Sequence, residues 1–162
     1  MTAYAVLKLV HVFAVILFLG NIITGVFWMR MADRTRDLAI ICFAMRGINR
    51  SDKWFTIPGV IVITAGGIAA AIEGGLPLLR TGWIFWSLVM FSISGIIFSV
   101  KLAPLQREIA RITAHSGEEN EFNWTYYSSR LRQWEIWGLI AILTPLAALV
   151  MMVLKVPVKS VF

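Results

Sequence analysis

Residues 4–28 read YAVLKLVHVFAVILFLGNIITGVFW, an apolar stretch interrupted only by a lysine, a histidine and a few small or polar residues. A membrane-spanning helix needs about 20 such residues to cross a hydrocarbon core of about 30 Å, with its backbone hydrogen bonds made inside the helix. The stretch also exceeds the apolar core of a signal peptide and lacks a basic segment before it. We therefore expect it to form a transmembrane helix that is retained.

The rest of the chain contains three more stretches of this kind, at about residues 55–72, 83–103 and 134–154. Hydrophobic residues make up 59% of the 162 residues and the mean hydropathy is +0.78, both well above the values of soluble domains. We therefore predict an all-α polytopic membrane protein. Residues 1–162 would form a single domain, a bundle of four transmembrane helices solvated by the lipid bilayer.

The distribution of basic residues predicts the orientation of the bundle. The net charge of +6 does not indicate nucleic-acid binding, because the cations form no basic stripe with interleaved aromatic residues. Between the second and third stretches only Arg80 is basic. The first and third connections carry Arg30, Arg34, Arg36, Arg46, Arg50, Lys53, Lys101, Arg107, Arg111, Arg130 and Arg132. The positive-inside rule then makes those two connections cytoplasmic and places both termini outside, in the periplasm.

Other features of the connections predict interfacial structure. Five tryptophans near the ends of the stretches are expected at the headgroup level: Trp28, Trp54, Trp83, Trp134 and Trp137. Leu38 to Met45 is apolar but too short to span, and we expect an interfacial helix there. A helical pattern continues past Pro104 to Thr113 as an amphipathic extension, and residues 117–123 read as an exposed polar turn.

Polar residues inside the apolar stretches are the candidates for function, since they are costly in lipid. His11 follows Tyr4 by about two helical turns, which places it roughly 10 Å inside the first helix and toward the bundle interior. Its neutral imidazole could hydrogen-bond a neighbouring helix, or it could be an axial ligand of haem iron. Lys8 is close enough to the surface to snorkel. Asn21 is expected to hydrogen-bond across helices.

Counting residues from the outer helix ends places Met90 of the third helix, and Gly66 and Gly67 of the second, at the depth of His11. The glycines could leave room for a flat macrocycle, and His/Met is a known axial pair. The alternatives are ordinary packing of Met90 and close helix packing at the glycines. The other histidine, His115, lies in a connection, so a bis-His haem would need His11 from a second chain.

Residues 7–20, LKLVHVFAVILFLG, resemble the first helix of a group of bacterial membrane proteins. The group includes HemJ-type protoporphyrinogen oxidases, CopD-type copper resistance proteins and a predicted integral membrane family of unknown function. The resemblance to the last extends through WFTIPG at residues 54–59 and Gly82-Trp83. In HemJ-type enzymes the first-helix histidine is associated with b-type haem and a nearby lysine with activity, which implies such roles for His11 and Lys8.

These observations favour a bacterial inner-membrane protein that binds haem b through His11 and has a redox or electron-transfer role. Met90, Gly66 and Gly67 would complete the cofactor site, and Lys8 is the catalytic candidate of a haem-dependent oxidoreductase. The alternative is a non-catalytic accessory or assembly subunit, because the connections are short and reactive groups are few. Either protein could act as a homo-oligomer or within a larger membrane complex.

Overall fold

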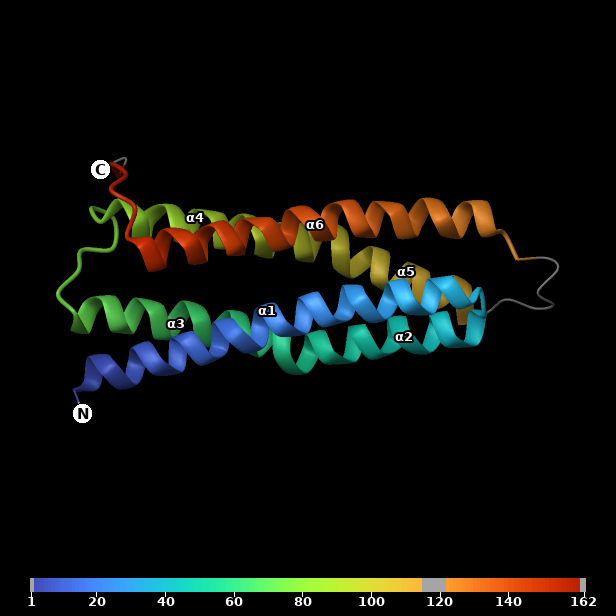
Figure 1. The fold of residues 1–162 in the computed structure, drawn as a ribbon, viewed down its shortest axis with the longest axis horizontal. Helices are drawn as coiled ribbons and strands as arrows, with labels where there is room; N and C mark the ends of the chain where they lie inside the picture. Colours follow the sequence, from blue (N-terminus) through green and yellow to red (C-terminus); the bar gives the residue numbers. More distant parts are fainter. Residues whose placement is uncertain (1, 115–121, 161–162) are drawn as a thin grey trace.

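The computed structural model describes residues 2–114 and 122–160, and all regular structure in these ranges is helical. Two short π-helical segments, η1 (Asp52–Thr56) and η2 (Phe98–Leu102), connect consecutive α-helices without a break. The α-helices are α1 (Ala3–Thr35), α2 (Leu38–Ser51), α3 (Ile57–Glu73), α4 (Gly82–Ile97), α5 (Ala103–Ala114) and α6 (Trp124–Leu154). Figure 1 shows that α1 begins and α6 ends at the same end of an elongated bundle.

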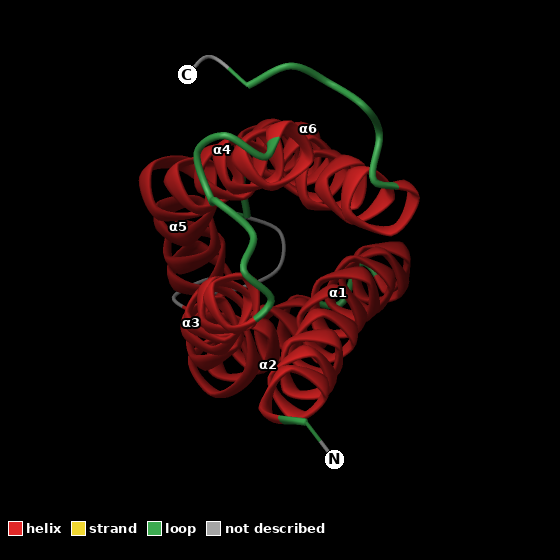
Figure 2. Ribbon diagram, turned by 90° about the vertical axis from the view of Figure 1, so that its left-hand side faces the viewer, coloured by secondary structure: helices red, strands yellow, loops and turns green. Residues whose placement is uncertain are grey.

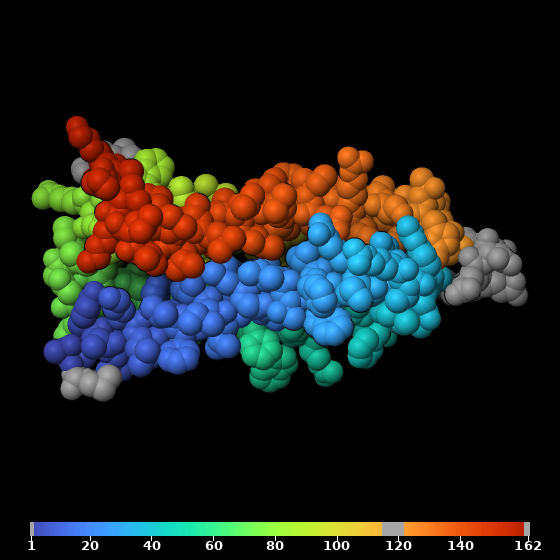
Figure 3. All heavy atoms as spheres, viewed as in Figure 1, coloured from blue at the N-terminus to red at the C-terminus, as the bar shows by residue number. Residues whose placement is uncertain are grey.

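The described chain thus forms four long helices, and each is long and apolar enough to cross a membrane. In the most apolar part of each helix only 17% to 28% of the residues are buried inside the protein. Most side chains in these parts are therefore at least partly exposed, which suits lipid as the solvent. Figure 3 shows the side of the molecule on which α1 and α6 lie next to each other. The prediction of an all-α bundle with four spanning helices is confirmed.

The helices continue past the predicted spans at the end of the bundle opposite the termini. They contain 31 to 36 residues, which at 1.5 Å per residue gives about 50 Å, well beyond the hydrocarbon core. The prediction of an interfacial helix at Leu38 to Met45 is wrong, because α2 continues through η1 into α3 and packs against α5 and α1. Its apolar residues recur at helical spacing and find partners inside the protein. The predicted extension past Pro104 is confirmed as α5.

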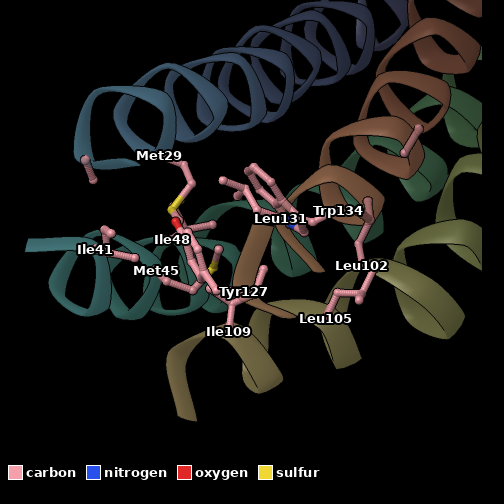
Figure 4. Close-up of a cluster of buried hydrophobic side chains, with 12 residues drawn as sticks. Met29, Ile41, Met45, Ile48, Leu102, Leu105, Ile109, Tyr127, Leu131 and Trp134 are labelled. Carbon is pink, nitrogen blue, oxygen red and sulfur yellow. The ribbon is translucent and has the colours of Figure 1, made fainter. Parts of the chain in front are cut away.

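The extended end holds the main core of the protein (Figure 4). Tyr127, Met29 and Ile109 are fully buried there, and the Tyr127 hydroxyl donates a hydrogen bond to Asp33 at 3.0 Å. Trp134 belongs to this core and is 4% exposed, so its ring packs against other side chains, and its depth at the headgroup level stays a prediction. By contrast, Trp28 is 59% exposed, as an interfacial residue would be.

Toward the termini the bundle separates into two helix pairs, α1 with α3 and α4 with α6. Figure 2 views this end and shows the two pairs on opposite sides of the bundle axis. A small cluster of Ala14, Phe18, Leu19 and Ile63 holds α1 against α3.

Two buried serines of α4 hold the second pair together. Pro145 has no backbone N–H, so the carbonyl of Ala141, one turn earlier in α6, loses its usual donor. Ser94 donates its hydroxyl to this carbonyl at 2.7 Å, and Ser87 donates to the carbonyl of Ala148 at 3.1 Å. Since unsatisfied carbonyls are costly in lipid, these bonds favour the contact between α4 and α6.

Candidate functional site

His11 lies at the interface of α1 and α3, and its ring is oriented by one hydrogen bond. Its Nδ1 atom lies 2.8 Å from the backbone carbonyl oxygen of Ile63. A carbonyl only accepts hydrogen bonds, so Nδ1–H donates and the neutral ring keeps the lone pair on Nε2. Nε2 has no hydrogen-bond partner among the described residues. The arrangement therefore offers one nitrogen as a base or as a metal ligand.

The two predicted glycines lie directly against this histidine. A Cβ atom on Gly67 would lie 3.0 Å from both Nδ1 and Cε1 of His11, and one on Gly66 would lie 3.6 Å from the Cβ of His11. The imidazole itself thus takes the space that the missing side chains leave. An iron atom would bind on the Nε2 side of the ring, so the glycines would support the ligand and not the macrocycle.

The other two predicted site residues make no hydrogen bond or ring contact with His11 in the described part of the chain. Met90 is partly buried on α4, which packs mainly against α6, whereas His11 belongs to the α1–α3 pair. Lys8 is exposed, and its ammonium lies 6.0 Å from the centroid of the Tyr4 ring. Residues 115–121, which include His115 and most of the predicted polar turn, lie outside the described residues.

A second polar site lies deeper in the bundle, around Asp52 of η1, which is 6% exposed. Thr56 donates its hydroxyl to Oδ1 of Asp52 at 2.6 Å, and the side-chain amide of Gln106 donates to Oδ2 at 3.0 Å. The amide of Asn21 donates to Oδ1 at 3.3 Å and to the Thr56 hydroxyl oxygen at 3.0 Å. Asp52, Thr56, Asn21 and Gln106 form what we call the Asp52 network, which joins three of the four long helices.

The Asp52 network faces a cavity of about 400 Å³ between the helix pairs. All four residues of the network line it, together with apolar side chains that include Phe18, Phe91 and Phe98. Every long helix contributes to the wall. Concave, mostly apolar sites with a few converging polar groups are the usual form of ligand-binding sites in proteins.

Both π-helical segments lie in the wall of this cavity. Asp52 and Thr56 come from η1, while Phe98, Ser99 and Leu102 come from η2. π-turns inside α-helices occur frequently at functional sites. The coincidence of two π-turns, a buried carboxylate and a cavity makes this a candidate binding site that is separate from His11.

Sequence reasoning found only part of the Asp52 network. The amide of Asn21 was expected to bond across helices, and it does. The predicted second span begins three residues later, at Phe55, and so leaves Asp52 in the first connection. A usable signal existed, since Ile48, Asp52 and Thr56 continue at i, i+4 spacing the buried face of α2.

A family described as predicted integral membrane protein (DUF2269) matches residues 5–156, and the chain belongs to this family. The match agrees with the resemblance to an integral membrane family of unknown function, while the relationship to HemJ-type and CopD-type proteins stays a prediction. No curated protein and no solved structure matched the chain.

Proposed function

We propose that this integral membrane protein binds b-type haem with His11 as an axial ligand and has a redox or electron-transfer role. The observation that supports it is the hydrogen bond from Nδ1 of His11 to the carbonyl of Ile63. Metal-ligating histidines commonly donate their second ring nitrogen in this way, which fixes the ring and makes the ligating nitrogen more basic. The haem would supply reversible one-electron oxidation and reduction when bound.

The chain's own residues have defined parts in this proposal. Ile63 and Gly67 hold the imidazole so that Nε2 stays free to ligate. Met90, on the α4–α6 pair, would be the second ligand of a haem held between the two helix pairs; the alternative is His11 of a second chain, which would make the functional unit a homodimer. We place the protein in a bacterial inner membrane, on the basis of its basic connections.

An absorption spectrum of the detergent-purified full chain, expressed with haem supplied, tests the proposal. We expect a Soret band that is lost in His11→Ala and kept in the matched control His115→Ala. Gly67→Ala should lower the haem content, since the new Cβ would lie 3.0 Å from the ring, whereas Gly20→Ala meets open space and should not.

Two results would count against the proposal. One is a colourless protein after haem supply, and the other is a spectrum that His11→Ala leaves unchanged. A colourless chain that copurifies in stoichiometric amount with a larger membrane enzyme would favour the accessory-subunit function instead. If Met90 is the second ligand, Met90→Leu should shift the reduction potential and the spectrum of the reduced protein while haem remains bound.

A further inference from the structure

The cavity between the helix pairs contains a carboxylate whose hydrogen-bond partners are all neutral. Asp52 accepts from a hydroxyl and two amides, and none of the ion pairs among the described residues includes it. A carboxylate offers about four acceptor positions, of which these donors fill three. A buried charge without an opposite charge is costly, so a cationic group that reaches Asp52 would be strongly favoured.

The hydrogen bonds of the network are arranged to suit the charged form of this carboxylate. The Thr56 hydroxyl accepts from Asn21, so its own hydrogen is directed at Asp52. Gln106 approaches the other carboxylate oxygen from α5. Hydrogen bonds to ionised acceptors are stronger than neutral ones, and the three donors leave one acceptor position of this cavity-lining carboxylate unfilled.

The rest of the cavity requires a ligand with an apolar body. Phe18, Ile22, Phe91 and Phe98 form much of its wall, and a volume of about 400 Å³ is within the range of small-molecule sites. A bare metal ion would leave this space unused, and the described residues contain no group of three or more His, Cys, Asp or Glu side chains that could hold one. Trp134, also in the wall, has a buried indole N–H without a hydrogen-bond partner in the described part of the chain.

We propose that this cavity binds an amphipathic organic amine, with the protonated nitrogen paired to Asp52 and the apolar body packed among the phenylalanines. His11 is not part of the cavity wall, so substitutions of Asp52 leave the proposed iron ligand in place. The ligand would bridge the α1–α3 and α4–α6 pairs, which contribute opposite sides of the wall.

A pair of probes with the same apolar body tests this proposal: 2-(1-naphthyl)ethylamine and 2-(1-naphthyl)ethanol. Binding to the detergent-purified full chain is measured by isothermal titration calorimetry. We expect the amine to bind at one site per chain and at least about tenfold more tightly than the alcohol, because only the amine pairs with Asp52. Equal affinities of the two probes would overturn the proposal and indicate a purely apolar pocket.

Variants test whether Asp52 is the residue that pairs with the amine. Asp52→Asn should reduce the affinity for the amine to that for the alcohol, while Glu73→Gln, which changes an exposed carboxylate at the far end of α3, should leave it unchanged. Retained tight binding of the amine by Asp52→Asn would refute the proposal.

A second variant keeps the test valid if Asp52→Asn does not fold. Gly95 lines the cavity, and a Cβ there would meet no atom within 4 Å, so Gly95→Leu should fill the space while the Asp52 network stays intact. We expect binding of the amine to fall at least about tenfold without a lower melting temperature. Unchanged binding by this variant would also refute the proposal.

Discussion

Buried hydroxyl groups in this bundle are matched to individual backbone carbonyls. Ser94 reaches the carbonyl of Ala141, which Pro145 deprives of its donor, so a polar side chain on one helix compensates for a proline on another. Ser87 donates to the carbonyl of Ala148, where no proline removes the donor of the helix itself. The apolar surroundings leave no water to replace these donors, which is why the position of a single hydroxyl affects how α4 and α6 pack.

Ser94→Ala should therefore lower the free energy of unfolding by about 0.5–1.5 kcal/mol. The loss should shrink toward zero in a Pro145→Ala background, because alanine restores the backbone N–H that bonds to Ala141. Titration with SDS in mixed micelles measures the four unfolding free energies of this double-mutant cycle. Ser99→Ala is the control, since its exposed hydroxyl bonds within its own helix. Equal losses in both backgrounds would show that the Ser94 bond does not compensate for the proline.

Single residues also show how far sequence reasoning reached. Counting along rigid helices of constant rise placed Gly66 and Gly67 at the depth of His11, and the structure has them in contact. The same counting could not give the direction of the imidazole, which depends on the carbonyl of Ile63. The sequence does not indicate the hydrogen bond between Gln106 and Asp52, because only the tertiary fold brings these two distant residues together.

The two π-turns determine how the long helices present their side chains to the cavity. A π-turn contains one residue more than an α-turn, so it can be inserted while the helix on either side keeps its face toward the core. The π-turn η1 connects α2, which packs in the main core, to α3, which packs against α1. Asp52, at the start of η1, is buried between the helices. Helix periodicity alone does not predict such a turn, so sequence reasoning divided this helix into a connection and a span.

Deletion of the exposed Lys53 from η1 should consequently be tolerated. The segment would close as a regular α-turn, α2 and α3 would keep their faces, and the melting temperature should stay within a few degrees of the wild type. The binding of 2-(1-naphthyl)ethylamine should be lost, because Asp52 and Thr56 would no longer have their present spacing.

Deletion of the exposed Ile61 from regular α3 provides the comparison. It would rotate everything after it by about 100° and turn Gly66 and Gly67 away from His11, so a loss of folded, monodisperse protein is expected. Size-exclusion chromatography and thermal unfolding measure both variants. Equal damage from the two deletions would contradict the role given to η1.

The whole molecule is a bundle that is tightly packed at one end and divided into two helix pairs at the other, with the cavity between. The packed end contains the main core and most of the basic side chains, which lie on helical extensions and not in flexible connections. An ion pair between Arg30 and Glu135 at 3.0 Å joins α1 to α6 there. Hydropathy predicts the membrane-spanning segments. The helical extensions beyond them are stabilised by side-chain contacts that form only when the helices pack together.

The concentration of Arg and Lys at the packed end predicts that this end faces the cytoplasm. In a Cys42→Ala background, Leu79→Cys labels the connection between α3 and α4, and Ala39→Cys labels the packed end; both positions are exposed. A membrane-impermeant maleimide added to intact bacterial spheroplasts should modify Leu79→Cys at once and Ala39→Cys only after the membrane is permeabilised. The reverse order would invert the bundle, and it would place the Asp52 network nearer the outer face and His11 nearer the cytoplasm.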